Sequence, residues 1–253
     1  KEQRAVRLEA PRIGEAAASY DAAVAAAAAK LATASRAGKL GVIASPRALS
    51  EDLYAWREVA LRLGGATFGA RSLVSGANDS LLVRADKGAN ARGAAWIFGA
   101  TASDDAVLAA VAKGSVTTLL VLGDTLDPAD TLALPAAGKG KVEVIFAGPF
   151  ASGAAVDAAV AIPSASWSEA DGTFVNFEGR AQSVLRCHLP LGEARPGWRI
   201  AADVAAAAGV PLPEWAIASD VLRALSQSVK EFGGVTAESM GLLGVAAPAA
   251  AGV

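Results

Sequence analysis

Cys187 and His188 are adjacent, and they are the only cysteine and the only histidine among the 253 residues of the chain. A closed zinc or iron–sulfur site takes about four ligands, so this pair cannot build one. A cysteine–histidine nucleophile pair needs the two side chains to meet, and neighbours in a strand point to opposite faces. We therefore predict structural roles for both residues, no catalytic residue and no metal site.

Other known catalytic and binding loops are absent. A serine hydrolase would have to use His188 as its base, and no G-x-S-x-G elbow occurs. The stretch "AAGKGKVE" at 136–143 lacks the spacing of a phosphate-binding loop and its final serine or threonine. It also precedes an expected strand instead of a helix. We therefore predict neither a serine hydrolase nor a phosphate-binding loop.

Two further places carry polar residues that could bind or catalyse. Gly123 and Asp124 end an expected strand, at the carboxyl edge where α/β sheets bind ligands. No G-x-G-x-x-G follows, so a plain turn explains them better than a binding loop. Glu169 and Asp171 could act as general acid and base. They precede Gly172 in a turn context, where carboxylates commonly cap or turn the chain, and we favour that structural role.

The elements that must position these residues alternate between helix and strand. Ser19 is an expected helix cap and Gly38 a helix end, with alanines between them. By similar signals, helices are expected at 19–38, 50–65, 103–114, 152–160, 197–209 and 213–229, and strands at 39–45, 116–124, 141–149 and 160–164. This alternation predicts an α/β fold, a Rossmann-like parallel sheet with flanking helices.

Changes in composition and periodicity along the sequence divide the chain into four expected parts. We expect an N-terminal arm at 1–18, a Rossmann-like domain at 19–165, an irregular loop with C-terminal helices at 166–245, and a flexible Ala/Pro-rich tail at 246–253.

Composition limits the partners. The net charge is −2 and no basic run occurs, which argues against a nucleic-acid partner or an anionic membrane surface. No stretch of bulky apolar residues approaches 18, so we predict no membrane insertion, and no signal peptide is visible. A single cysteine excludes an intramolecular disulfide and fits a reducing compartment.

The stretch "AIPSASWSEADGTFVNFEGRAQ" at 161–182 resembles molybdopterin oxidoreductases, and most of all the large iron–sulfur subunit of bacterial NADH-quinone oxidoreductase, respiratory complex I. The residues that carry the resemblance are Pro163, Glu169, Gly172, Thr173, Phe174, Asn176, Glu178, Gly179, Arg180 and Gln182. Formate dehydrogenase-like relatives typically differ at the position of Gly179. Other stretches follow in family-like order over roughly residues 7–210.

The resemblance implies a molybdopterin-oxidoreductase-like fold and a non-catalytic scaffold part of a peripheral-arm subunit. Such a subunit lies on the cytoplasmic side of the inner membrane, contacts other subunits of the complex, and supports electron transfer from NADH to quinone. The cysteine-rich cluster-binding region of the family is not matched here. Iron–sulfur clusters and FMN are therefore expected in other parts of the assembly, and no cofactor in this segment.

Two alternatives stay open: a reduced, formate dehydrogenase-like molybdopterin oxidoreductase, and a stand-alone nucleotide-binding module. If a pterin is bound, the resemblance suggests Gly172, Thr173, Asn176 and Arg180 as its contacts.

Two side-chain arrangements are expected within the 161–182 stretch. Arg180 can form a bidentate ion pair with Glu169 or Glu178. Phe174 and Phe177 lie three apart, so in an extended stretch one should anchor in the core while the other meets a neighbour.

Overall fold

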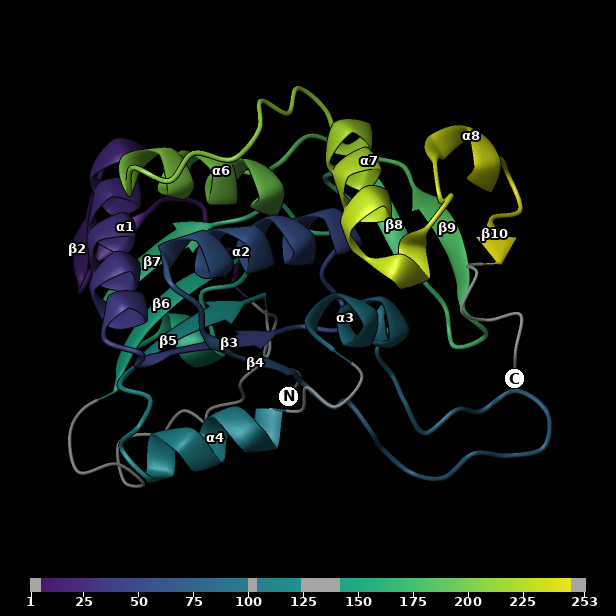
Figure 1. Cartoon of the computed structure of the whole chain (residues 1–253), viewed down its shortest axis with the longest axis horizontal. Coiled ribbons are helices and arrows are strands. Elements are labelled where there is room, and N and C mark those ends of the chain that lie inside the picture. Colours follow the sequence, from purple (N-terminus) through teal and green to yellow (C-terminus); the bar gives the residue numbers. More distant parts are fainter. Residues whose placement is uncertain (1–5, 100–103, 124–141, 247–253) are drawn as a thin grey trace.

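The structure is a computed structural model that describes residues 6–99, 104–123 and 142–246. At its centre lies a seven-stranded sheet of order β2-β1-β7-β6-β5-β3-β4 (Figure 1). Its strands are β1 (Arg12–Ile13), β2 (Ala16–Ala17), β3 (Leu40–Ala44), β4 (Thr67–Ala70), β5 (Thr118–Leu122), β6 (Glu143–Gly148) and β7 (Val160–Pro163). The five strands from β4 to β7 are parallel, and β1 and β2 are antiparallel at one edge.

Helices cover both faces of this sheet. Helices α1 (Tyr20–Arg36), α2 (Ser50–Leu63) and α6 (Gly197–Ala207) lie together over one face, and α4 (Asp104–Ala112) lies over the other (Figure 1). Successive strand residues point to opposite faces. Val42 of β3 accordingly joins the core under α1 and α2, while its neighbour Ile43 joins the core under α4. The predicted parallel sheet with flanking helices is confirmed.

Alanine allows helix α1 to pack closely. Ser19 caps the helix by accepting a hydrogen bond from the N–H of Ala22 at 3.3 Å, as its residue type predicts. Ala23 and Ala27 are fully buried on the inner face of the helix. A bulky residue at either position would push the helix away from the sheet and from α6.

The N-terminal segment takes part in the sheet. The sequence predicts an arm over 1–18, but β1 pairs with β7, and Arg12 lies opposite Ala161. Since β7 ends the parallel part of the sheet, its outer edge offers unpaired backbone groups, and β1 satisfies them. Residues 1–5 lie outside the described part of the chain, and the division into four parts remains a prediction.

The C-terminal part is more regular than the irregular loop expected there. A three-stranded antiparallel sheet of order β10-β9-β8 is built from β8 (Gly172–Val175), β9 (Arg180–Val184) and β10 (Val245–Ala246). It is accompanied by α3 (Ala91–Phe98), α7 (Ala218–Ser228) and α8 (Ala237–Met240). Ala246, expected to begin the tail, lies in β10, and residues 247–253 are outside the described residues.

Short 3-10 turns complete the fold, at Gly153–Ala155 and Lys230–Phe232. The first replaces the small helix expected at 152–160. Among the described helices, none is long and apolar enough to cross a membrane.

Candidate functional site

A cavity of about 540 Å³ opens at the carboxyl edge of the parallel strands. Its walls include Ser45 after β3, Gly123 after β5, Pro149 after β6 and Ser164 after β7. The carboxyl ends of four parallel strands therefore converge on one hollow. This is the edge at which open α/β sheets bind ligands.

The order of the strands explains why the cavity lies beside β3 and β5. After β3 the chain crosses to β4 on one side, and the next sheet strand, β5, pairs with β3 on its other side. The two connections leave in opposite directions, and loops that part in this way leave a crevice between them. Gly123, predicted to lie at this edge, lines the cavity, whereas Asp124 lies outside the described residues.

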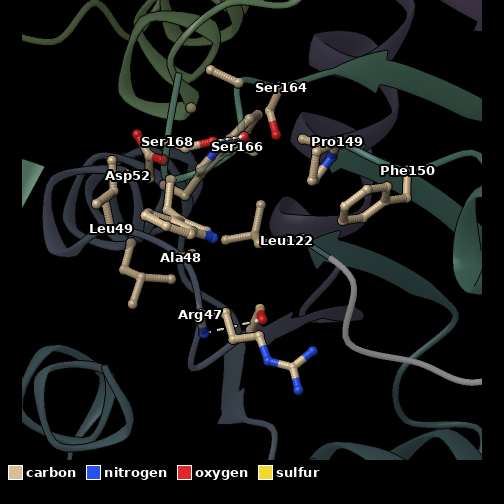
Figure 2. A pocket seen from close by; sticks show the side chains of 18 of the residues that line it. Arg47, Ala48, Leu49, Asp52, Leu122, Pro149, Phe150, Ser164, Ser166 and Ser168 are labelled. Carbon is tan, nitrogen blue, oxygen red and sulfur yellow. Dashed lines mark hydrogen bonds between the residues drawn. The ribbon is translucent and has the colours of Figure 1, made fainter. Parts of the chain in front are cut away.

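The cavity has a hydroxyl-bearing side and a cationic side. Figure 2 shows Ser164, Ser166 and Ser168 on one side and Arg47 on the other. The backbone N–H of Arg47 donates to the hydroxyl of Ser45 at 3.2 Å, which fixes the turn that follows β3. Within the described ranges, no carboxylate lies within ion-pairing distance of the Arg47 guanidinium. The donor set therefore suits an anionic group.

Asp52 of α2 also lines the cavity and ties α2 to α6. It accepts a hydrogen bond of 2.8 Å from the N–H of Trp198, in the first turn of α6. Burial raises the pKa of Asp52 to about 7, although the N–H groups of Trp198 and Gly197 favour its charged form. Asp52 therefore caps a helix whose own N-cap, Pro196, supplies no side-chain hydrogen bond.

Glu169 is paired with Arg7, which also lines the cavity. The guanidinium donates to both carboxylate oxygens, each at 2.7 Å, and the Glu169 side chain is fully buried. Burial disfavours the charged carboxylate, but the hydrogen bonds from Arg7 and from the Ser166 N–H outweigh it and lower the pKa of Glu169. The expected pairing of Arg180 with Glu169 is wrong, because Arg7 already occupies both oxygens.

Arg180 has another partner. Its guanidinium donates to the backbone carbonyl of Gly244 at 3.0 Å, which ties β9 to the chain just before β10. In the described ranges no ion pair joins Arg180 to Glu178, so the second expected pairing is also wrong. Asp171 accepts the N–H of Arg186, 15 residues further along the chain, at 2.8 Å, which joins the start of β8 to the segment after β9. The local turn-forming role favoured for Asp171 stays a prediction.

The other candidate pterin contacts hold β8 and β9 in place. Thr173 is buried, and its N–H and hydroxyl donate to Glu51 at 2.8 and 2.7 Å. The Asn176 side-chain oxygen accepts the N–H groups of Glu178 and Arg180, which closes the hairpin. Gly172 lies so close to Glu51 that a Cβ there would be 2.7 Å from its Oε2. Their role as cofactor contacts remains a prediction, since none of these residues lines the cavity at the sheet edge.

The two phenylalanines of the stretch have different environments. Phe174 is half-buried and packs against Leu49 and two alanines. Phe177 is 53% exposed, and the Arg84 guanidinium carbon lies 4.4 Å from the centre of its ring. One ring is thus turned inward and the other outward, whereas contact of Phe177 with a neighbouring chain stays a prediction.

His188 contacts a serine, which sequence reasoning missed because the two lie 20 residues apart. Ser168 Oγ lies 3.2 Å from His188 Nε2, and both residues line the cavity. His188 Nδ1 lies 3.2 Å from the carbonyl oxygen of Leu189 and 3.9 Å from Glu169, whose carboxylate is held by Arg7. The contact joins the 166–169 turn to the segment after β9, where the Cys187 N–H also donates to the Ser168 carbonyl.

Cys187 is exposed and does not line the cavity. Among the described residues, no cluster of three or more His, Cys, Asp or Glu side chains could hold a metal ion.

Comparison with models of protein families relates a large part of this chain to a known family. Residues 83–207 match the family model described as molybdopterin oxidoreductase. This part of the chain is therefore similar to molybdopterin oxidoreductases. The match extends from the segment before α3 to the end of α6, and it includes the 161–182 stretch in which the resemblance was seen. The family part of the resemblance is thus supported, whereas its assignment to complex I is a finer statement that the match does not make.

Two curated relatives are similar to parts of the chain. The F420-dependent formate dehydrogenase 1 subunit alpha of Methanococcus maripaludis is 34% identical over 87 residues, covering 34% of this chain and 13% of that protein. The probable oxidoreductase YjgC of Bacillus subtilis is 40% identical over 60 residues, covering 24% of this chain and 6% of that protein. The aligned parts are thus a small fraction of these relatives.

Solved structures show only distant likeness. Acetylene hydratase from Pelobacter acetylenicus aligns over 77% of this chain and 24% of its own, with 16% identity and a TM-score of 0.40. A chain of the formyltransferase/hydrolase complex from Methylorubrum extorquens aligns over 77% of this chain and 97% of its own, with 14% identity and a TM-score of 0.41.

Proposed function

We propose that this chain is part of a formate dehydrogenase-like molybdopterin oxidoreductase and that its cavity receives the nucleotide portion of a pterin dinucleotide cofactor. The observation that carries this proposal is the position of the cavity, at the carboxyl edge between β3 and β5. The similarity to a formate dehydrogenase subunit supports it. The alternative considered from the sequence is therefore preferred to the complex I scaffold.

The residues of the cavity fit a phosphorylated nucleotide. Its volume of about 540 Å³ lies in the usual range for small-molecule and cofactor sites. Gly123 has a φ of +80°, and a Cβ there would lie 2.8 Å from the Ser45 Cβ, so glycine keeps this wall open. Arg47 offers a guanidinium suited to phosphate, and the serine hydroxyls opposite can bind sugar or base oxygens.

When bound, a molybdenum or tungsten pterin would supply two-electron redox chemistry. In this proposal the residues of this chain bind and orient the cofactor. Arg47 would hold the phosphate charge, Ser164 and Ser166 would hold polar groups on the opposite wall, and Trp56 would supply an apolar surface. Asp52, which accepts the Trp198 N–H, keeps α6 beside this wall.

A second function is favoured by a different observation. Thr173, Asn176 and Arg180 of the 161–182 stretch are engaged in hydrogen bonds inside the chain. Such engagement suits a non-catalytic scaffold, as in the peripheral arm of NADH-quinone oxidoreductase on the cytoplasmic side of the inner membrane. In that case iron–sulfur clusters and FMN would belong to other parts of the assembly, and the chain itself would carry no catalytic group.

Metal and pterin analysis of the native complex, purified through this chain, separates the two functions. Stoichiometric molybdenum or tungsten, a fluorescent pterin after oxidation, and formate-dependent reduction of a viologen dye would support the formate dehydrogenase-like function. Co-purifying iron–sulfur and flavin proteins, without molybdenum, tungsten or pterin, would support the scaffold instead.

A third outcome has its own measurement. If the chain purifies alone and free of metal, titration calorimetry with GDP tests the stand-alone nucleotide-binding module. Binding that is lost in Arg47→Ala would support such a module. Absence of binding would exclude it and leave the scaffold.

A further inference from the structure

The segment between β4 and α3 projects from the body of the molecule (blue in Figure 1). At its tip Leu81 and Leu82 are 80% and 81% exposed, and Val83 is 48% exposed. We call these three residues the leucine tip. Adjacent aliphatic side chains presented to solvent form a surface of a kind that often marks an interaction site.

The leucine tip is held in a fixed shape by its own backbone contacts. One oxygen of Asp79 accepts the N–H groups of Leu81, Leu82 and Val83 at 2.7–2.8 Å. The arms of the loop are joined as well, since the Ser75 N–H donates to the Ala85 carbonyl and Val74 is bridged to Asp86. A partner that binds here would meet a loop that is already ordered, which lowers the entropic cost of association.

A second hollow, of about 590 Å³, lies beside the loop and carries cations. We call it the basic groove, and its lining includes Arg84, Lys87, Arg92, Trp96 and Phe177. The Arg84 guanidinium stacks on the exposed ring of Phe177 with a separation of 4.4 Å. Arg84 directly follows Val83, so the basic groove and the leucine tip form one continuous surface.

Cations outnumber carboxylates around the basic groove, although Asp79 of the same loop partly offsets the charge of Arg84. Asp86 is the one carboxylate in its lining, and its oxygen accepts the Gly88 N–H. Among the described residues, no carboxylate lies within ion-pairing distance of Arg84, Lys87 or Arg92. Cations clustered in this way attract a partner of opposite charge.

We infer that the leucine tip and the basic groove together form a docking surface for an acidic protein segment that carries apolar side chains. The cations would receive its carboxylates, and Leu81 and Leu82 would pack against its apolar residues. A nucleic acid would use the cations but has no need of two exposed leucines. A two-fold interface centred on the basic groove would set the same cations close to each other, which disfavours self-association of that kind.

A defined peptide tests this surface on the full 253-residue chain. The probe is a fluorescein-labelled dodecamer, Glu-Glu-Leu-Leu repeated three times, measured by fluorescence anisotropy. Two comparison peptides replace every glutamate by lysine or every leucine by serine. We expect binding of the glutamate–leucine peptide that weakens with salt, at least tenfold weaker binding of the glutamate–serine peptide, and no binding of the lysine–leucine peptide.

Variants locate the binding site. Arg84→Glu with Arg92→Glu, and separately Leu81→Ser with Leu82→Ser, should each weaken binding at least tenfold while the circular dichroism spectrum stays unchanged. The matched controls, Arg36→Glu and Leu242→Ser with Leu243→Ser, change exposed residues elsewhere and should bind as the unmodified chain does.

Three results would overturn the inference. The first is binding that survives both groove and tip variants, and the second is no binding of the glutamate–leucine peptide at low salt. The third is a labelled single-stranded DNA dodecamer that binds as tightly and depends on the arginines but not on the leucines, which would make the surface a general anion site.

Discussion

Arg7 and Glu169 lie 162 residues apart and form a bidentate ion pair, with both N···O distances at 2.7 Å. Glu169 belongs to the stretch that resembles molybdopterin oxidoreductases, and Arg7 belongs to the segment expected to be an unstructured arm. Arg7 also donates to the Pro149 carbonyl after β6 and lies 5.7 Å from the centre of the Phe150 ring. One side chain thus joins the start of the described chain, the end of β6 and the family stretch at the rim of the cavity.

Loss of this ion pair should destabilise the fold strongly. Arg7→Met leaves the Glu169 carboxylate buried without its cation, which costs about 3–5 kcal/mol when one partner of a buried pair is removed. Urea unfolding followed by circular dichroism measures this loss. Arg36→Met, at an exposed site, is the control and should stay within about 0.5 kcal/mol. The double variant Arg7→Met with Glu169→Gln should recover part of the loss, and a cost for Arg7→Met no larger than the control would contradict the prediction.

The stability of the protein should fall between about pH 5 and pH 8 because of Glu51. Burial raises the pKa of Glu51 from 4.5 to about 8, although the Thr173 hydroxyl and N–H favour the charged form. A folded-state pKa above the unfolded one means that the native state holds the proton more tightly. Its contribution is therefore complete below about pH 4.5 and is lost as the pH rises through about 8.

Glu51→Gln isolates this contribution. Between pH 5 and pH 8 the unmodified chain should lose on the order of 3 kcal/mol relative to this variant, at about 1.4 kcal/mol per pKa unit. The measurement is the free energy of unfolding in urea at both pH values, with the exposed Glu193→Gln as control. Equal pH dependence of Glu51→Gln and the unmodified chain would show that Glu51 is ionised throughout.

The sheet could be predicted from the sequence because its central strands are buried on both faces. Such strands appear as short apolar runs between helices with recognisable ends, as in Leu40–Ala44 and Thr118–Leu122. Helix α3 was missed because Gly88, Asn90 and Gly93 suggest turns. The structure uses them differently: Asn90 is fully buried and accepts the Val175 N–H at 2.8 Å, which ties α3 to β8.

The site was harder to predict because it is assembled from distant parts of the chain. Gly123 was noted for its place after an apolar strand, but it was interpreted as a plain turn. Arg47 and Ser164 carry no motif and reach the cavity only because β3 and β7 end at the same edge of the sheet. The partner of Glu169 was sought nearby, at Arg180, since local pairing is all that spacing can suggest. A contact across 162 residues leaves no periodic signal in a single sequence.

As a cap of α6, the Asp52 side chain should contribute about 1–2 kcal/mol to the free energy of unfolding, which is the usual cost of removing a capping side chain. Its carboxylate accepts the Trp198 N–H at 2.8 Å, and the N-cap Pro196 offers no replacement. Asp52→Ala should therefore lower the free energy of unfolding by this amount. Asp52→Asn keeps an acceptor oxygen and should recover most of it. An equal loss in both variants would assign the effect to the charge of Asp52 and not to capping.

Arg47→Ala should separate cofactor binding from folding. The Arg47 side chain lies at the cavity wall, and the residue is exposed, so its truncation should change the free energy of unfolding by less than about 0.5 kcal/mol. If it holds a phosphate, the pterin and metal content of the purified complex should fall at least tenfold, since a charge-assisted hydrogen bond contributes about 1.5–3 kcal/mol. Arg47→Lys should retain intermediate content, and Arg36→Ala should match the unmodified protein. Full cofactor content in Arg47→Ala would place the phosphate elsewhere.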